Sequence, residues 1–266
     1  MSQQFVPNTN QLPEELRELW PRLGELPSDC IAYGSMATSL RLGGEQPPPT
    51  LEFKTALAFD ADQFKESVPF LRDAQLAERD PLTHSFLEAR VETSHGPVQL
   101  TIQGDCRLGE IHKPDRCPEN GLAVASLQDI AGSKMLDISK RTEAQDYRDV
   151  ASLIERGGVS VAEMAGAARA ITRGAFDDVA QQRAIEKLHS PSTALSELSE
   201  RDRSVIECDA VQSEAREISF EARPHLSMGN STFQDRAFKS ELSASAQRPS
   251  LGLDLNDQIK RGATRR

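Results

Sequence analysis

The segment 126–153 constrains the fold most, because both of its stretches with helical spacing carry charges on apolar faces. At about 100° per residue, Lys134 lies in the middle of the apolar face of the first stretch. On the second stretch, Asp146 lies on the apolar face and Asp149 lies near its edge. A charge on a packed surface is costly unless it is paired or bound to a charged group. We therefore expect these side chains either to pair between the two helices or to meet a charged ligand.

Length and charge limit the class of protein. The chain has 266 residues, a net charge of −10 and a pI near 5.1. This acidity argues against bulk binding of DNA or RNA through positive charge, although it leaves room for a local basic site. No segment reaches the roughly 20 apolar residues of a membrane span, and the segment 1–16 lacks the basic and apolar regions of a signal peptide. We expect a cytoplasmic protein with no membrane partner.

A short apolar stretch over 30–33 runs directly into Gly34 and Ser35, and helical spacing resumes over 36–42. A strand, a Gly-Ser turn and a helix together aim backbone N–H groups and a hydroxyl at one point, as phosphate-binding turns do. An ordinary tight turn between a strand and a helix has the same sequence. Both interpretations therefore stay open at this point.

Spacing and turn residues predict the other elements of the N-terminal half. The expected elements are a helix over 13–26 interrupted at Pro21, a strand over 51–59, a helix over 60–74 capped by Asp60, a hairpin of strands 86–93 and 97–103, and an exposed loop over 105–120. Ser126, followed three residues later by Asp129, predicts the start of the first helix in the segment 126–153.

Beyond residue 158 the pattern is helical, and no strand signal returns. Helices are expected over 161–172, 177–189 and 194–218. Apolar residues become sparse from residue 220, which predicts disorder. These patterns indicate an α/β fold, with a small mixed sheet flanked by helices, then an all-helical region and a flexible tail. The expected division is 11–125 for the α/β core, 126–218 for the helical region and 219–266 for the tail.

Two stretches resemble a known family. They are IAYGSMATSLRLGG over 31–44 and VASLQDIAGSKMLDISKRTEAQDYRDVASL over 124–153. With the alternating strand between them, they resemble the AbiEii/AbiGii-type nucleotidyltransferase toxins, which belong to the DNA polymerase β-like nucleotidyltransferase superfamily. The similarity covers residues 25–175. Its more specific part consists of Lys134 on a helix, Arg141 after it, and a D-Y-x-D pair formed by Asp146 and Asp149.

The resemblance implies an enzyme that transfers a nucleotide from an NTP to an RNA acceptor, such as tRNA, with Mg²⁺ as cofactor. It also implies a sheet of the nucleotidyltransferase type and a cognate antitoxin protein, as part of a toxin–antitoxin or phage-defence system. Carried over by position, the nucleotide-binding residues are Gly34, Ser35, Lys134 and Arg141. The catalytic residues are Lys134, Asp146 and Asp149, and the metal ligand is Glu52.

The metal-binding carboxylates depart from the family pattern. Two Mg²⁺ ions need several anionic oxygens that converge within a few ångströms. The family has two aspartates on the strand after the first helix and one on the next central strand, where this chain has Thr50, Glu52 and Thr101. Since one carboxylate remains, the alternative to an enzyme is an inactive protein of this fold that acts as a nucleotide-binding or protein-interaction module.

Each candidate residue also has a purely structural interpretation. Lys134 serves equally well as an ion-pair partner of the two aspartates, which would then orient it or Arg141. Glu52 is otherwise an exposed strand residue. Arg41 and Lys54 are expected on the surface.

Overall fold

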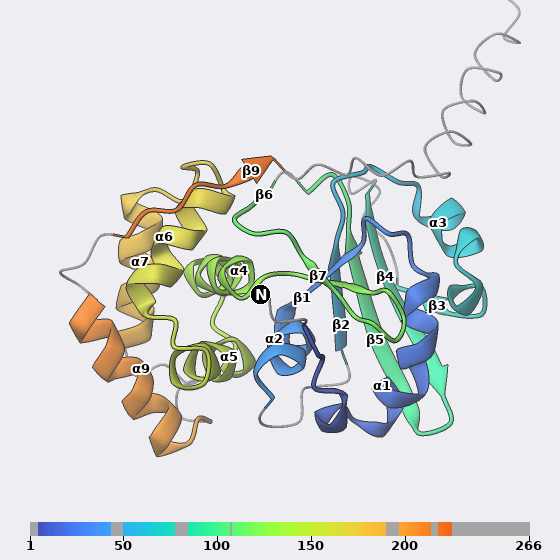
Figure 1. Ribbon diagram of the computed structural model, residues 1–266, viewed down its shortest axis with the longest axis horizontal. Coiled ribbons are helices and arrows are strands. Elements are labelled where there is room, and N and C mark those ends of the chain that lie inside the picture. Colours follow the sequence, from blue (N-terminus) through green and yellow to red (C-terminus); the bar gives the residue numbers. More distant parts are fainter. Residues whose placement is uncertain are drawn as a thin grey trace, which may run out of the picture. The chain divides into compact units, whose positions relative to one another are not determined.

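The computed structural model describes residues 5–43, 50–77, 85–106, 108–189, 197–213 and 218–224 (Figure 1). These residues confirm the expected α/β class, with a mixed sheet that is flanked by helices and followed by a helical region. They belong to one compact unit, Met1–Gly229. The expected boundary between residues 125 and 126 falls within this unit. Most of the expected tail lies outside the described residues.

A seven-stranded mixed sheet is built from the described residues, with the strand order β3-β4-β5-β2-β1-β8-β7. Its strands are β1 (Ile31–Tyr33), β2 (Thr50–Lys54), β3 (Gln75–Leu76), β4 (Phe86–Thr93), β5 (Gly96–Gln103), β7 (Asp115–Arg116) and β8 (Ala123–Val124). β2 runs parallel to β5, and β1 runs parallel to β8, while the other neighbours are antiparallel. The predicted hairpin is confirmed as β4 and β5.

The two faces of the central strand β2 differ in polarity. Leu51 and Phe53 are buried, whereas the residues that alternate with them stay partly exposed, as the period of two in a strand requires. On the polar face, Glu52 lies opposite Tyr33 of β1 and opposite Thr101 of β5. The sheet therefore presents a polar face where β1, β2 and β5 meet.

Short helices flank this sheet. They are α1 (Glu14–Leu19), η2 (Trp20–Glu25), α2 (Gly34–Leu42), α3 (Ala61–Ser67) and η3 (Pro69–Leu71). Asp60 caps α3 as predicted, because its Oδ1 accepts from the backbone N–H groups of Asp62 and Gln63 at 3.0 and 2.9 Å. The helix is shorter than the predicted 60–74, since Pro69 starts a separate 3₁₀ turn and disfavours helical backbone in the residue before it.

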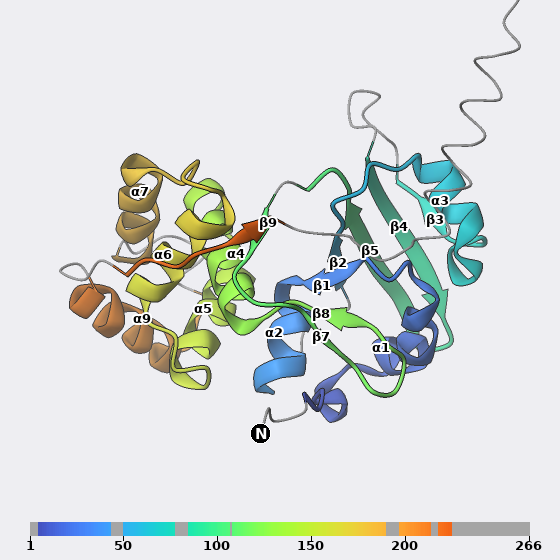
Figure 2. The same cartoon turned by 45° about the horizontal axis from the view of Figure 1, so that its top comes forward.

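The helical region consists of α4 (Leu127–Lys140), α5 (Ala144–Glu155), α6 (Val161–Ile171), α7 (Asp178–His189) and α9 (Glu200–Ser213). Figures 1 and 2 show these helices gathered on one side of α2, with β2, β4 and β5 on the other. Ser126 caps α4 as predicted, accepting from the N–H of Asp129 at 3.1 Å. α4 is central to the region, because α2, α5, α6 and α7 all pack against it.

Two other predictions were wrong. Residues 105–120 are not an exposed loop throughout, because the described part contains β6 (Gly109–Glu110) and β7, and buries Ile111 and Cys117. A strand also returns after residue 158, since β9 (Arg223–Pro224) pairs antiparallel with β6 (Figure 1). Strands of two residues are too short to show a periodic pattern, which is why the sequence did not predict them.

The predicted strand over 51–59 ends at Lys54. Thr55 turns the chain, because its hydroxyl accepts from the N–H of Leu57 at 3.1 Å and donates to the carboxylate of Asp29. The alternation of residue types in the sequence from residue 55 to Phe59 therefore lies outside the strand.

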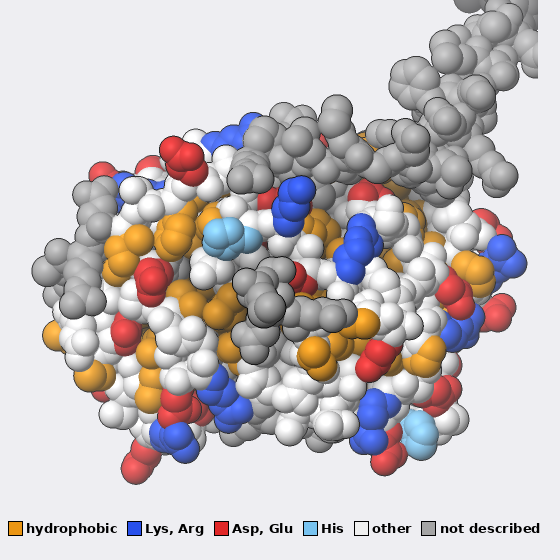
Figure 3. All heavy atoms as spheres, viewed as in Figure 1, with side chains coloured by type: hydrophobic (Ala, Val, Ile, Leu, Met, Phe, Trp, Pro, Cys, Tyr) orange, Lys and Arg blue, Asp and Glu red, His pale blue; other side chains and the backbone are white. Residues whose placement is uncertain are grey.

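On the face in Figure 3, basic and acidic side chains of the described residues are interspersed, so neither sign of charge forms a separate patch there. Among those residues, no helix has the length and apolarity required to cross a membrane.

Candidate functional site

A buried ion-pair network joins α4 to α5. Lys134 Nζ lies 2.9 Å from Oδ1 of Asp146 and 2.7 Å from Oδ2 of Asp149. The three side chains are only 2%, 2% and 6% exposed, respectively. Of the two arrangements expected for these charges, the structure shows the one in which they pair between the two helices.

Arg141 extends this network toward the surface. Its Nε donates at 2.7 Å to Oδ2 of Asp146, and its Nη2 donates at 3.1 Å to Oδ1, a bidentate geometry typical of strong pairs. Burial alone would raise the pKa of Asp146, but Lys134 and Arg141 hold that pKa below its ordinary value. Burial also opposes the charge on Lys134, yet Asp149 and Asp146 hold the pKa of Lys134 well above its ordinary value. Lys134 and Asp146 are therefore charged at neutral pH.

Gly34 and Ser35 are the first two residues of α2 rather than a separate turn. Ser35 Oγ donates at 2.7 Å to Oδ2 of Asp149, the same oxygen that faces Lys134. Gly34 has a φ of +69°, and a Cβ at this position would lie 2.5 Å from Oε2 of Glu52. The backbone conformation therefore favours glycine here.

The N-terminus of α2 is a potential anion-binding position. Its N-cap residue, Tyr33, offers the helix no side-chain hydrogen bond. The first N–H groups of a helix have no acceptor within the helix, and the helix dipole favours negative charge beside them. Gly34 and Ser35 contribute two of these groups, and the Glu52 carboxylate lies beside Gly34.

Glu52 is not part of a carboxylate cage. Thr101 lies opposite it on β5, and Thr50 precedes it by two positions on the same strand face. Within the described ranges, no group of three or more His, Cys, Asp or Glu side chains is placed to hold a metal ion. Since Mg²⁺ needs several oxygen ligands, the residues present do not fit the two-metal centre that the family resemblance implies.

Lys54 is not the simple surface residue that the sequence predicted. Its Nζ donates at 2.6 Å to Ser133 Oγ on α4 and lies 4.4 Å from the ring centroid of Tyr33. Burial between β2 and α4 lowers the pKa of Lys54, while Asp137 and Glu52 act in the opposite direction. The spacing of two residues from Glu52, which places both on one strand face, is the sequence signal that could have assigned Lys54 to the site.

Arg41 is also not a surface residue. Its Nη2 donates to Oδ2 of Asp115 at 2.9 Å and to the carbonyl of Val124 at 3.1 Å, and its Nε donates to the carbonyl of Ala125. Its guanidinium lies 4.7 Å from the ring centroid of Phe5. These contacts tie α2 to β7 and β8, which gives Arg41 a structural role.

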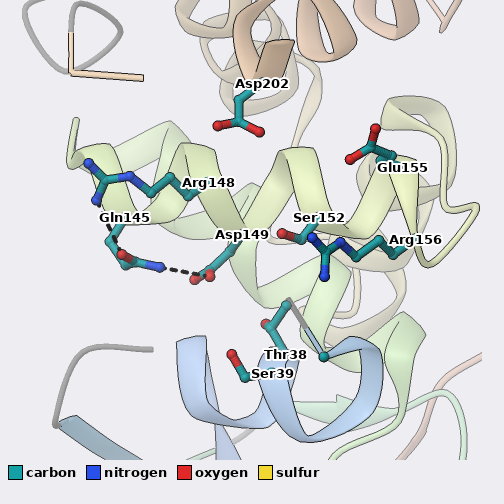
Figure 4. Close-up of a pocket in the computed structure, with 10 residues that line it drawn as sticks. Thr38, Ser39, Gln145, Arg148, Asp149, Ser152, Glu155, Arg156 and Asp202 are labelled. Atoms are coloured by element: carbon teal, nitrogen blue, oxygen red, sulfur yellow. Dashed lines mark hydrogen bonds between the residues drawn. The ribbon is translucent and has the colours of Figure 1, made fainter. Parts of the chain in front are cut away.

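A polar cavity of about 120 Å³ lies beside α2, α5 and α9 (Figure 4). Its lining includes Thr38 and Ser39 of α2, Arg148, Asp149 and Ser152 of α5, and Asp202 of α9. Of the predicted site residues, only Asp149 lines it, and Gln145 Nε2 donates to Oδ1 of that carboxylate at 3.1 Å. The cavity and the N-terminus of α2 are therefore two distinct candidate positions for a ligand.

No protein-family model and no curated protein matches the sequence. Solved structures similar to the chain include two nucleotidyltransferases. A candidate nucleotidyltransferase from H. pylori has 15% identity and a TM-score of 0.46, with 75% of this chain and 92% of that chain covered. MenT4, a nucleotidyltransferase toxin from Mycobacterium tuberculosis, has 14% identity and a TM-score of 0.36, with coverage of 86% and 91%. These values are too low to assign an activity, so the chemistry of the site rests on its own residues.

The structure brings the predicted site residues together in two adjoining groups. The first is the network of Ser35, Lys134, Arg141, Asp146 and Asp149, and the second is the pair of Gly34 and Glu52. The arrangement offers an anion the N-terminus of a helix and nearby ammonium groups. For a metal ion, the second group provides a single carboxylate, that of Glu52.

Proposed function

We propose that this chain binds the triphosphate of a nucleotide at the N-terminus of α2, as a protein of the nucleotidyltransferase type that does not catalyse two-metal transfer. The observation that carries the proposal is the left-handed backbone of Gly34, at a φ of +69°, at the start of a helix whose N-cap residue gives it no side-chain hydrogen bond. A positive φ favours glycine, as in other turns that bring N–H groups to phosphates.

The charges around this position support binding rather than transfer. Asp149 ties Ser35 to Lys134, which fixes the first turn of α2 against α4 and α5. Transfer by two metal ions requires anionic oxygens around both ions. Glu52, flanked by Thr50 and Thr101, supplies one carboxylate.

The second candidate is nucleotidyl transfer from an NTP to an RNA acceptor, such as tRNA, in a toxin–antitoxin or phage-defence system. The spacing of Lys134, Arg141 and the pair Asp146 and Asp149 favours it, because these positions match the AbiEii-type motif. In that case Mg²⁺ would be the cofactor and an antitoxin protein the partner. A single-carboxylate site would then have to support the reaction.

One experiment separates binding from transfer. Purified protein is incubated with each radiolabelled NTP and total RNA, in Mg²⁺, in Mn²⁺ or in EDTA. Equilibrium dialysis measures binding, and a denaturing gel measures label on RNA. The proposal predicts bound NTP and unlabelled RNA. Labelled RNA that disappears in Glu52→Gln would support the second candidate instead.

A protein that binds none of the four NTPs under any of these conditions would contradict both candidates. The remaining hypothesis would then be that the protein acts as a protein-interaction module. Glu52→Gln is the better control than a change at Lys134, because Glu52 is partly exposed whereas Lys134 is buried between two aspartates.

A further inference from the structure

We infer that residues 218–224 form a releasable strap, which holds the segment 108–112 in place beside Tyr33 of β1. When the strap leaves α6, the segment 108–112 opens locally while the ion pairs between α4 and α5 stay closed. This conformational device goes beyond the proposed function and does not depend on nucleotide binding.

The backbone of the strap crosses α6 at Gly166. A Cβ at residue 166 would overlap the carbonyl oxygen of Ile218, and it would lie 2.9 Å from the carbonyl carbon of Ile218 and 3.4 Å from Cδ2 of Phe220. Figures 1 and 2 both show this part of the chain running across α6 toward β9. Glycine at residue 166 therefore provides the space in which the strap lies.

The segment 108–112 is anchored at two points. The strap ends as strand β9, which pairs antiparallel with β6 inside this segment, and α6 also packs against β6. Directly after β6, the carboxylate of Asp129 on α4 accepts from the backbone N–H groups of Ile111 at 2.8 Å and of His112 at 3.4 Å. The strap and α4 therefore hold the same short segment.

This segment lies close to Tyr33, whose side chain is buried. Burial raises the pKa of Tyr33 well above its ordinary value, and the charges of Asp129, Cys106 and Glu110 act in the same direction. Glu110 belongs to β6, and Asp129 binds the two residues that follow it. The segment 108–112 is therefore part of the cover that keeps water from Tyr33.

The strap is held by fewer contacts than the helix that it crosses. Ile218, Phe220 and Ala222 remain partly exposed, and the residues between them are exposed. Its pairing with β6 involves only two residues on each strand, whereas the ion pairs of Lys134 are buried. Elements with little buried surface and short pairing open at a lower free energy than the core. Release of the strap can therefore occur without unfolding of α4 and α5.

Hydrogen exchange of the full chain, measured by mass spectrometry, tests this inference with Gly166→Ala as the releasing variant. The added Cβ cannot share the space of the Ile218 backbone, whereas alanine is the better residue for the interior of α6. We expect exchange at least about tenfold faster than in wild type in peptides that cover 218–224 and 108–112. Exchange in α4 and α5 should not change.

A second variant tests the same contact from the strap. Phe220→Ala removes a side chain that packs against the core and lies beside Gly166, and it is expected to accelerate exchange in the same two segments. Ser219→Ala, at an exposed position of the strap, is the control and should exchange like wild type. Thermal unfolding verifies that each variant is folded.

Three results would overturn the inference. Wild-type exchange at 218–224 in both Gly166→Ala and Phe220→Ala would show that the strap does not depend on this contact. Faster exchange at 218–224 with wild-type exchange at 108–112 would show that the strap does not hold that segment. Faster exchange that extends to α4 and α5 would show that the strap opens only when the whole fold opens.

Discussion

Ser35 donates its hydroxyl proton to Asp149, across 114 residues of sequence, at 2.7 Å. The accepting oxygen also lies 2.7 Å from the ammonium of Lys134. The start of α2 and the packing of α4 on α5 are therefore joined through one carboxylate. A change in the buried ion pairs will reach the proposed nucleotide-binding position through this oxygen.

Lys134→Met is expected to destabilise the protein strongly. It leaves Asp146 and Asp149 buried with fewer compensating charges, and breaking one partner of a buried pair costs about 3–5 kcal/mol. Urea denaturation measures the free energy of unfolding. Lys140→Met, at an exposed position on the same helix, is the control and is expected to change it by less than about 0.5 kcal/mol.

The double variant Lys134→Met with Asp146→Asn tests whether uncompensated charge causes the destabilisation in Lys134→Met. If the penalty comes from uncompensated charge, the double variant is less destabilised than the sum of the two single variants. If the two single changes in the free energy of unfolding add up to that of the double variant, Lys134 and Asp146 are not coupled and the explanation is contradicted.

Ionisation of Asp146 should contribute to the change in the free energy of unfolding at acid pH. Lys134 and Arg141 hold the pKa of Asp146 below its ordinary value of 3.8, so the ionised form stabilises the folded state above this pH. That contribution is lost as the pH falls through the lower pKa of the folded state. Lys134 has a pKa raised above 10.5, so its contribution is complete below that pH and is lost only in stronger alkali.

Unfolding free energies from pH 7 down to pH 3 test this dependence. The difference in stability between wild type and Asp146→Asn should be constant near neutral pH and should narrow below about pH 4. Asp73→Asn, at an exposed position, controls for the loss of one acidic side chain. A difference for Asp146→Asn that does not vary with pH would contradict the account.

Gly132→Ala should destabilise the contact between α4 and α6. A Cβ at residue 132 would lie 2.8 Å from the carbonyl carbon of Ala167 and 2.9 Å from the nitrogen of Ala168. Helix propensity favours alanine over glycine by about 1 kcal/mol, but backbone atoms cannot move aside as a flexible side chain can, and overpacking costs about 1–3 kcal/mol. We expect a net loss in the free energy of unfolding, with Gln128→Ala on the same helix as control. A stabilised Gly132→Ala variant would contradict such close packing.

Restoring carboxylates beside Glu52 should create a metal site. Thr101 lies opposite Glu52 and Thr50 lies two positions away on the same strand face, and directly opposed side chains on neighbouring strands have Cβ atoms about 5 Å apart. The double variant Thr50→Asp with Thr101→Asp is expected to bind Mn²⁺ by titration calorimetry at least about tenfold more tightly than wild type. Thr93→Asp, at the end of β4, is the control. Equal affinities in all three proteins would show that these positions do not converge.

The sequence predicted the buried charges because the helical period assigns each residue to a face. Lys134, Asp146 and Asp149 are close in sequence, on two helices joined by a short turn, so the choice of partners was small. Local signals also predicted the caps at Asp60 and Ser126 and the hairpin of β4 and β5, since a cap and a hairpin each depend on neighbouring residues.

Contacts between distant segments could not be predicted in this way. The partner of Ser35 lies 114 residues away, and Lys54 meets Ser133 only after β2 and α4 have packed together. The family resemblance aligned Gly34 and Glu52 with one site, but it carried no information about Lys54. Pairing of β6 with β9 depends on two strands of two residues each, which no periodic pattern marks.

The position of the bound nucleotide is the central claim, and hydrogen exchange measured by mass spectrometry tests it most directly. Exchange is compared for the full chain in EDTA, with and without a saturating concentration of the NTP that binds best. The account predicts slower exchange in peptides that cover the start of α2 and strand β2, at residues 31–42 and 50–54, and no change in α9. Protection confined to the cavity lining on α5 and α9, or no protection in any peptide despite bound NTP, would contradict the placement of the nucleotide at Gly34 and Ser35.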